Sequence, residues 1–180
     1  MEKTYEFKND KYIIAGYTLS NKEESEKYKT DIIFGEEDSV KWVLKINGKD
    51  IAFYNTGSNI VCEEHVVIEN DELNIITDFD YYKIDLITLK CLNHIDLTDY
   101  MSSLTCDLIK YRQGFLILCD LELICIENNK VKWVYDPYNG SGLENLEILE
   151  NNTIKIDVLD AYGLKMYTAY LDKDGKRAKK

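Results

Sequence analysis

Short apolar runs alternate with polar positions along most of the chain, at the spacing of β-strands. Three clear examples are Glu72–Asp78, Leu121–Glu127 and Thr153–Leu159. Each has the length of one strand, and β-branched and aromatic residues fill them. Asn, Asp and Gly separate the runs, and the chain holds a single proline. The pattern predicts an all-β protein of short strands joined by tight turns.

The strand pattern repeats with a period near 40 residues. Ile68–Ile75 matches Leu149–Ile156 position by position, 81 residues later. Gln113–Ile117 falls in register between these two copies, and Phe7–Ile14 precedes all of them. We therefore expect one β-repeat domain spanning 1–180, with repeats at about residues 4–55, 64–97, 106–139 and 144–177.

A period near 40 with four short strands per unit is typical of propeller blades. Through strings such as Tyr82–Lys90, the sequence resembles the broad β-propeller superfamily, particularly its quinoprotein-type and tryptophan-aspartate-type repeats. The paired Trp-Asp and the Gly-rich cofactor contacts of those families are missing, so no family binding residue is carried over and no cofactor is expected. The resemblance implies four propeller-like four-stranded repeats in a small or open propeller. The alternative is a β-sandwich or barrel whose hairpins look alike.

Two segments interrupt the repeats. A polar insertion at 20–30 lies in the first repeat and predicts a short exposed helix or a solvated loop. The last repeat ends in a basic tail, 176–180, where a fourth strand is expected. Either the N-terminal segment Lys3–Phe7 completes that sheet, or its edge stays open. Because open edges pair with other chains, a homodimer is an alternative to closure.

Net charge narrows the classes of partner. Acidic residues outnumber basic ones 33 to 22, which gives a net charge of -11. Such a chain repels a phosphate backbone, so we expect no binding of nucleic acid. The N-terminus lacks the basic-then-apolar pattern of a signal peptide, and the apolar runs fall far short of the roughly 20 residues that a membrane-spanning helix needs. A cytoplasmic protein that does not bind membranes is expected.

Both histidines lie three residues after a cysteine, as Cys62 with His65 and Cys91 with His94. These residue types can surround a zinc ion. However, residues three apart on a strand point to opposite faces, so Cys91 and His94 cannot chelate together without a bulge. We expect no bound metal. The five cysteines are odd in number, which favours free, mostly buried thiols.

No string typical of a catalytic nucleophile surrounds any Ser or Cys, so we expect no catalytic residue and no enzyme. Carboxylates do recur after the second strand of the later repeats. Asp favours tight turns, which explains this recurrence better than acid–base chemistry does. A hydrolase or lyase that uses these carboxylates with His65 is the less favoured alternative. The recurring carboxylates are Asp78 and Asp80, Asp120 and Glu122, and Asp157 and Asp160.

Acidic clusters in expected loops predict a surface that attracts a basic protein. A small acidic chain without an export signal also resembles, in profile, the immunity proteins that neutralise bacterial toxins in the cytosol. The resemblance implies a non-enzymatic protein-binding module for a basic toxin domain. An accessory propeller-like domain that binds a small molecule or glycan is the alternative. The expected partner-binding residues are Glu36, Glu37, Asp38, Glu63, Glu64, Glu69, Asp71 and Glu72.

Overall fold

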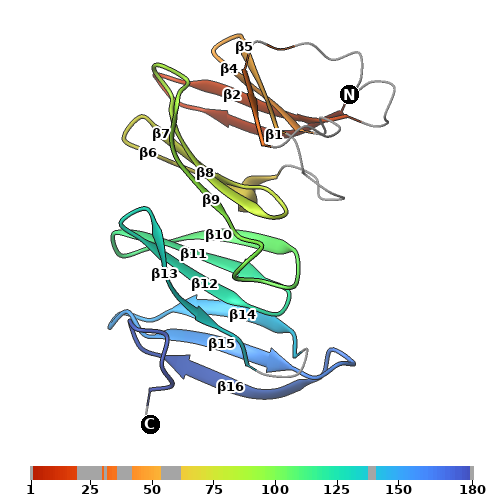
Figure 1. Ribbon diagram of the computed structural model, residues 1–180, viewed down its shortest axis with the longest axis vertical. Coiled ribbons are helices and arrows are strands. Elements are labelled where there is room, and N and C mark those ends of the chain that lie inside the picture. Colours follow the sequence, from red (N-terminus) through yellow and green to blue (C-terminus); the bar gives the residue numbers. More distant parts are fainter. Residues whose placement is uncertain are drawn as a thin grey trace. The chain divides into compact units, whose positions relative to one another are not determined.

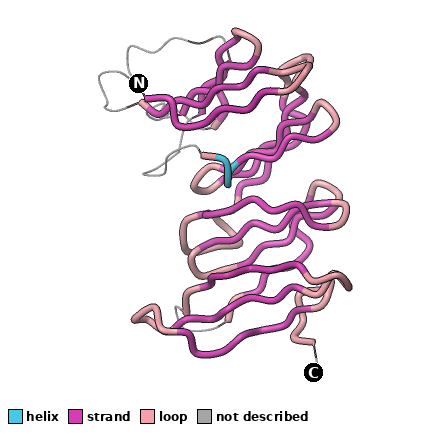
Figure 2. The backbone as a smooth tube through the Cα atoms, turned by 180° about the vertical axis from the view of Figure 1, so that it is seen from behind, coloured by secondary structure: helices cyan, strands magenta, loops and turns pink. Residues whose placement is uncertain are grey.

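The computed structural model describes residues 2–19, 30, 32–35, 42–53, 62–137 and 141–178. Over these residues the fold is all-β apart from one turn of 3-10 helix, Glu63–His65 (η1) (Figure 1). The strands form four small sheets of three to five strands each, none of them closed into a barrel. Figure 2 shows that loops join the strands directly, as the turn-rich sequence predicts. The predicted all-β class is confirmed, and the four sheets are consistent with an open propeller-like or sandwich fold.

The chain divides into two compact units, Met1–His94 and Ile95–Lys180. The first sheet of the first unit has the order β1-β2-β4-β5-β3. All its neighbours are antiparallel except β3, which runs parallel to β5. Apart from Thr30, the predicted insertion at 20–30 lies outside the described residues. The strands are β1 (Glu2–Lys8), β2 (Ile13–Thr18), β3 (Ile32–Phe34), β4 (Trp42–Ile46) and β5 (Lys49–Phe53).

The pairing of β1 answers one question that the sequence left open. Lys3 and Phe7 pair with Tyr17 and Ile14 of β2, so the N-terminal strand forms the outer edge of the first sheet. It therefore does not supply the missing strand of the last repeat. The reason is local, because a short turn at Asn9–Tyr12 lets β1 fold back directly onto β2.

The second sheet, in the order β6-β7-β8-β9, shares a hydrophobic core with the first. Trp42 and Phe53 of the first sheet and Tyr82 of the second are among its largest buried side chains. Burying one such side chain contributes roughly 1.5–3 kcal/mol, so the alternating pattern holds the two sheets together. The strands are β6 (Val66–Glu69), β7 (Glu72–Ile76), β8 (Asp80–Asp85) and β9 (Cys91–Asp96).

The second unit repeats this construction. A four-stranded sheet, β10-β11-β12-β13, shares a core with the three-stranded sheet β14-β15-β16. Leu116, Leu123, Ile156 and Leu171 are fully buried in that core. The strands are β10 (Thr105–Tyr111), β11 (Gly114–Cys119), β12 (Leu123–Glu127), β13 (Lys130–Tyr135), β14 (Leu143–Ile148), β15 (Ile154–Leu159) and β16 (Lys165–Leu171).

Left-handed residues at the hairpin tips explain why the repeats share a turn pattern. Asn70 and Asp71 have φ of 46° and 67°, and Asn128 and Asn129 have φ of 53° and 61°. Two consecutive left-handed residues match the twist of a two-residue hairpin, and Asn and Asp adopt this conformation at lower cost than most residues. The Asn-rich spacers of the sequence therefore fix the register of the strands that they join.

The described part of the basic tail lies against β16 through an isolated β-bridge between Leu171 and Arg177. After a turn, the amide of Ala178 donates to the carbonyl of Tyr170 (2.7 Å), and the amide of Asp172 donates to the carbonyl of Lys176 (2.8 Å). The turn packs on β13, where Trp133 Nε1 donates to the carbonyl of Lys173 (3.0 Å). The described part of the predicted tail is thus bound to the sheet, while 179–180 lie outside the described residues.

Candidate functional site

The acidic residues expected to bind a partner gather in the first unit. Glu63 and Glu64 form the exposed side of η1, and Glu69 and Glu72 flank the tip of the β6–β7 hairpin. Asp71 lies at that tip, and the other three, Glu36, Glu37 and Asp38, lie outside the described residues.

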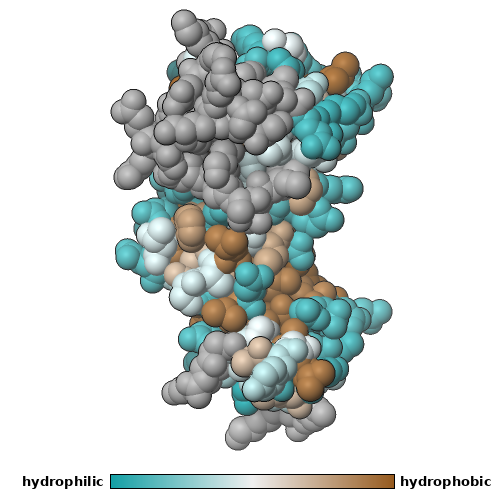
Figure 3. All heavy atoms as spheres, turned by 90° about the vertical axis from the view of Figure 1, so that its right-hand side faces the viewer, coloured by the Kyte–Doolittle hydropathy of each residue, from teal (hydrophilic) through white to brown (hydrophobic). Residues whose placement is uncertain are grey.

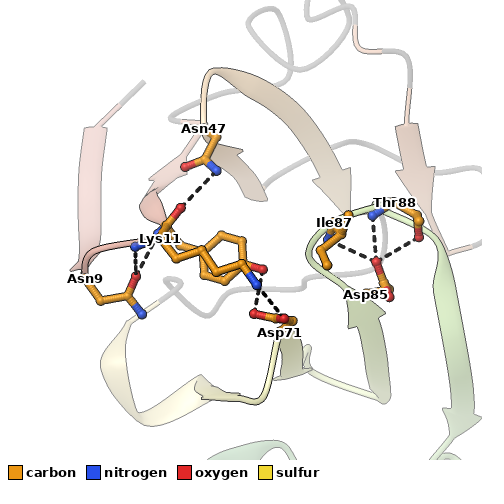
Figure 4. Close-up of polar contacts among 8 residues, drawn as sticks. Asn9, Lys11, Asn47, Asp71, Asp85, Ile87 and Thr88 are labelled. Atoms are coloured by element: carbon orange, nitrogen blue, oxygen red, sulfur yellow. Dashed lines mark hydrogen bonds and ion pairs between the residues drawn. The ribbon is translucent and has the colours of Figure 1, made fainter.

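Partners inside the first unit neutralise part of this charge (Figure 4). Asp71 forms an ion pair with Lys11 Nζ (2.5 Å) and accepts a hydrogen bond from the hydroxyl of Tyr12 (2.8 Å). The hydrogen bond from Lys11 is the main reason why the pKa of Asp71 is lowered. Glu72 pairs with Lys83 Nζ at 2.7 Å. Asp71 and Glu72 therefore join strands and turns of their own unit, and they are less available to a basic partner than the sequence suggests.

The two Cys–His pairs of the sequence have different partners in the structure. Cys62 Sγ lies 3.1 Å from His65 Nδ1, and the buried His65 ring packs on Trp42. Burial raises the pKa of Cys62 to about 11, so its thiol stays protonated near neutral pH. Cys91 instead donates to the carbonyl of Asn93. Across the described ranges, no group of three or more His, Cys, Asp or Glu side chains is arranged to hold a metal ion.

His94 forms a pair that the sequence did not indicate. Its Nε2 lies 2.6 Å from Asp80 Oδ1, and its ring stacks on Tyr82 with centroids 4.5 Å apart. A carboxylate that orients an imidazole is part of many general-base sites. Within the described residues, however, no hydroxyl or thiol is hydrogen-bonded to His94. No sequence signal could have found it, because the two residues meet only through the pairing of β8 and β9.

Two of the recurring carboxylates accept hydrogen bonds from residues outside their own turns, and a third stabilises its own turn. Buried Glu122 accepts hydrogen bonds from the hydroxyls of Ser102 (2.5 Å) and Ser103 (2.6 Å). Asp157 accepts one from the hydroxyl of Thr168 (2.8 Å) on the neighbouring strand. Asp160 stabilises its own turn, as the sequence predicted, because its Oδ1 accepts hydrogen bonds from the backbone amides of Tyr162 and Leu164 at 2.9 Å each. Glu122 and Asp157 are therefore committed to the fold, and one oxygen of Asp160 is engaged by its own turn.

A hollow of about 280 Å³ opens in the second unit. Three separate segments form it: the β11–β12 turn, the start of β14 and the end of β15. Buried Leu143 and Leu159 supply an apolar lining. Three carboxylates line it, two of them on exposed residues, and one accepts a hydrogen bond from the Cys106 thiol. The lining residues are Asp120, Leu121, Gly142, Leu143, Glu144, Leu159, Asp160 and Ala161.

Exposed apolar side chains follow the hollow directly along the chain. Tyr162 is 89% exposed, Leu164 67% and Met166 52%, all within the β15–β16 hairpin. Isolated exposed apolar residues are ordinary, whereas these three lie in one hairpin next to the hollow. On the face drawn in Figure 3, apolar and hydrophilic residues lie side by side on the described surface. We call the hollow and this hairpin together the acidic pocket surface.

Comparisons with known proteins show no family for this chain. No family model matches the chain, and no curated protein matches it. Among solved structures, a computationally designed protein, Ika8, has a TM-score of 0.44 at 12% identity, over 98% of this chain and 63% of that one. BBS1N, solved in complex with ARL6DN, has a TM-score of 0.41 at 9% identity, over 97% and 65%. The N-terminal domain of Nup159 has a TM-score of 0.36 at 8% identity, over 92% and 52%.

The chain spans less than two thirds of the length of each of these solved chains. At such TM-scores the likeness is too loose to carry a functional inference. In the described residues, no helix has the length and apolar character needed to cross a membrane.

Proposed function

We propose that the chain is a non-enzymatic protein-binding module that receives a basic segment of a partner protein at the acidic pocket surface. The observation that carries this proposal is the hollow itself, which brings Asp120, Glu144 and Asp160 together. Exposed Tyr162 and Leu164 follow its lining directly along the chain. A volume of about 280 Å³ suits one or two side chains rather than a large cofactor. The carboxylates would take the charge of Lys or Arg, while the exposed hairpin would cover the apolar stem.

Charge outside the hollow supports the same partner. The net charge of -11 attracts a basic protein over a long range and raises the rate of encounter. Glu63, Glu64 and Glu69 contribute to this field from the first unit. The expectation that they contact the partner stays a prediction, as does that for Asp71 and Glu72, whose charges are paired internally.

More specifically, we propose that this binding module is an immunity protein that neutralises a basic toxin domain in the bacterial cytoplasm. Its support is the acidic composition, the four-sheet β-scaffold and an exposed contact surface without a nucleophilic centre among the described residues. A homodimer through a sheet edge is a further proposal, since edge strands pair readily with other chains.

A second candidate is glycan binding at the same surface. The observation in its favour is Tyr162, which is 89% exposed and lies two residues after Asp160. An exposed aromatic ring can stack on a sugar while carboxylates accept its hydroxyl hydrogens. The two candidates differ in salt dependence, because an uncharged sugar is bound equally well at high ionic strength.

The test removes charge from the hollow and compares it with charge removed elsewhere in the same unit. The variant Asp120→Asn/Glu144→Gln loses two carboxylates of the lining. The control Glu150→Gln/Asp174→Asn loses two exposed carboxylates outside it, with the same change in net charge. Each immobilised variant is used to capture proteins from the native host at low and high salt, and each is screened on a glycan array.

We expect the wild type and the control to retain one basic protein at low salt and to release it at high salt. The lining variant should lose that protein. Equal capture by both variants would contradict the proposed site. Glycan binding that does not depend on salt, without a retained protein, would favour the second candidate.

A further inference from the structure

The carboxylates of the hollow differ in charge balance from others in the second unit. Asp120, Glu144 and Asp160 line the hollow, and no Lys or Arg among the described residues forms an ion pair with any of them. Elsewhere in the unit, ion pairs join Glu127 to Lys132 (2.5 Å), Glu147 to Lys155 (2.7 Å) and Asp157 to Lys165 (2.8 Å). A cation that reaches the hollow therefore meets negative charge that no described residue of the unit pairs with.

Among the described residues, each carboxylate of the hollow keeps at least one oxygen without a hydrogen-bond donor. Oδ1 of Asp160 accepts two backbone amides of its own turn, and Oδ1 of Asp120 accepts the Cys106 thiol at 3.2 Å. The Oδ2 atoms of both residues and both oxygens of Glu144 remain for a ligand. Asp120 and Glu144 are exposed and Asp160 is half-buried, so a ligand reaches them from solvent. The turn amides also hold the Asp160 carboxylate in place before a ligand binds, which lowers the cost of binding.

The three carboxylates are too widely spaced to coordinate one small ion. Within the described ranges, no group of three or more His, Cys, Asp or Glu side chains is arranged to hold a metal ion, and this includes the lining of the hollow. The carboxylates come from three separate segments and surround a volume of about 280 Å³. A larger cation whose donors are spread apart fits this spacing better than a point charge does.

Arginine meets this requirement and lysine does not. A guanidinium presents five N–H donors in a rigid planar fork and is weakly hydrated, whereas the lysine ammonium is a compact, strongly hydrated point charge. The arginine stem also packs on apolar surface. Buried Leu143 and Leu159 supply such a surface in the hollow.

We propose that the hollow is an arginine pocket, which receives one arginine side chain of the partner protein and selects it over lysine. The guanidinium donates to at least two of the three carboxylates, and its stem packs on Leu143 and Leu159. The inference rests on the proposed function, because it names the side chain through which the basic segment of the partner binds.

Two capped amino acids of equal charge test the preference. The full chain, labelled with ¹⁵N, is titrated at low salt with N-acetyl-arginine amide and, separately, with N-acetyl-lysine amide. NMR follows the backbone amide signals of Leu121, Leu143 and Ala161 in the lining. We expect both compounds to shift these signals, with a Kd about tenfold lower for the arginine compound, the gain typical of one more hydrogen bond to a charged group.

Glu144→Gln tests whether the pocket is the binding site. Because Glu144 has no hydrogen-bond or ion-pair partner among the described residues, the variant should fold as the wild type does, which circular dichroism checks. Glu150→Gln is the matched control, since it removes an exposed carboxylate outside the lining with the same change in net charge. We expect Glu144→Gln to raise the Kd of the arginine compound about tenfold and the control to leave it unchanged.

The possible failures of the two proposals are distinct. Equal Kd values for the two compounds would overturn the arginine pocket and leave the proposed function standing, since a basic segment can still bind through its overall charge. The arginine pocket is also wrong if neither compound gives a saturable shift, or if folded Glu144→Gln binds the arginine compound as tightly as the control does. The proposed function fails on a separate observation, which is equal capture of a host protein by the lining variant and its control.

Discussion

Gly114 offers the sharpest test of the strand pairing on which the acidic pocket surface depends. It begins β11 and pairs with Glu127 of β12, and β11 leads directly to Asp120 in the lining of the hollow. A Cβ added at Gly114 would lie 1.9 Å from the carbonyl oxygen of Ile126, whereas real Cβ atoms essentially never approach within 3.0 Å. In Gly114→Ala, the two backbones must therefore separate by at least about 1.1 Å at the end of this ladder.

The expected cost combines the strain of overpacking with the loss of hydrogen bonds between β11 and β12. Overpacking alone costs about 1–3 kcal/mol, and each lost hydrogen bond adds roughly 1 kcal/mol. We expect Gly114→Ala to lower the free energy of unfolding by about 3 kcal/mol. For a chain of this size, that corresponds to a fall in Tm of roughly 6–12 °C. Urea denaturation followed by circular dichroism measures the first quantity, and a thermal scan measures the second.

Gly142→Ala is the matched control, because the added Cβ would lie 3.5 Å from the side chain of Leu159, an ordinary van der Waals contact. We expect its free energy of unfolding to stay within about 0.5 kcal/mol of the wild type. If Gly114→Ala changed stability no more than this control does, the register of β11 against β12 would be wrong. The position of Asp120 beside Asp160 would then lose its basis.

Two further predictions concern ionisable groups in the first unit. Asp71 has a lowered pKa in the folded state, so its contribution to stability is present above its ordinary pKa of 3.8 and is lost as the pH falls through the lower folded value. Urea titrations should therefore show Asp71→Asn less stable than the wild type at pH 7, and the difference should shrink at acid pH; an equal difference at both pH values would contradict the Lys11–Asp71 pair. Because burial raises the pKa of Cys62 to about 11, its thiolate should be scarce at neutral pH, and alkylation by iodoacetamide should be roughly a hundredfold slower than for an unperturbed thiol. Peptide mass spectrometry measures this rate, and labelling of Cys62 as fast as in the urea-unfolded chain would show that the interpretation is wrong.

Much of the fold could be predicted because its signals are local. Alternating apolar positions in Thr153–Leu159 correspond to β15, and the Asn-rich spacers correspond to hairpin tips with left-handed residues. Both effects act between residues only a few positions apart. The pairing of β1 was not predictable in the same way, because two sheet edges competed for it and the pattern of Lys3–Phe7 fits either.

The candidate sites could not be predicted from local sequence patterns. The sequence singled out Asp71 by the charge of its neighbours, yet in the structure its carboxylate pairs with Lys11, which lies 60 positions away in the sequence. The hollow draws its carboxylates from three separate segments, and no single stretch of sequence contains the arrangement.

The sequence by itself therefore determined an acidic, all-β chain of repeated short strands, since composition, periodicity and turn residues act locally. The tertiary structure alone decided which charges are neutralised, where Asp120, Glu144 and Asp160 converge, and that Arg177 packs on Tyr167. The physical reason is that an ion pair or a hollow depends on distances between residues remote in sequence. Strand pairing and core packing set those distances.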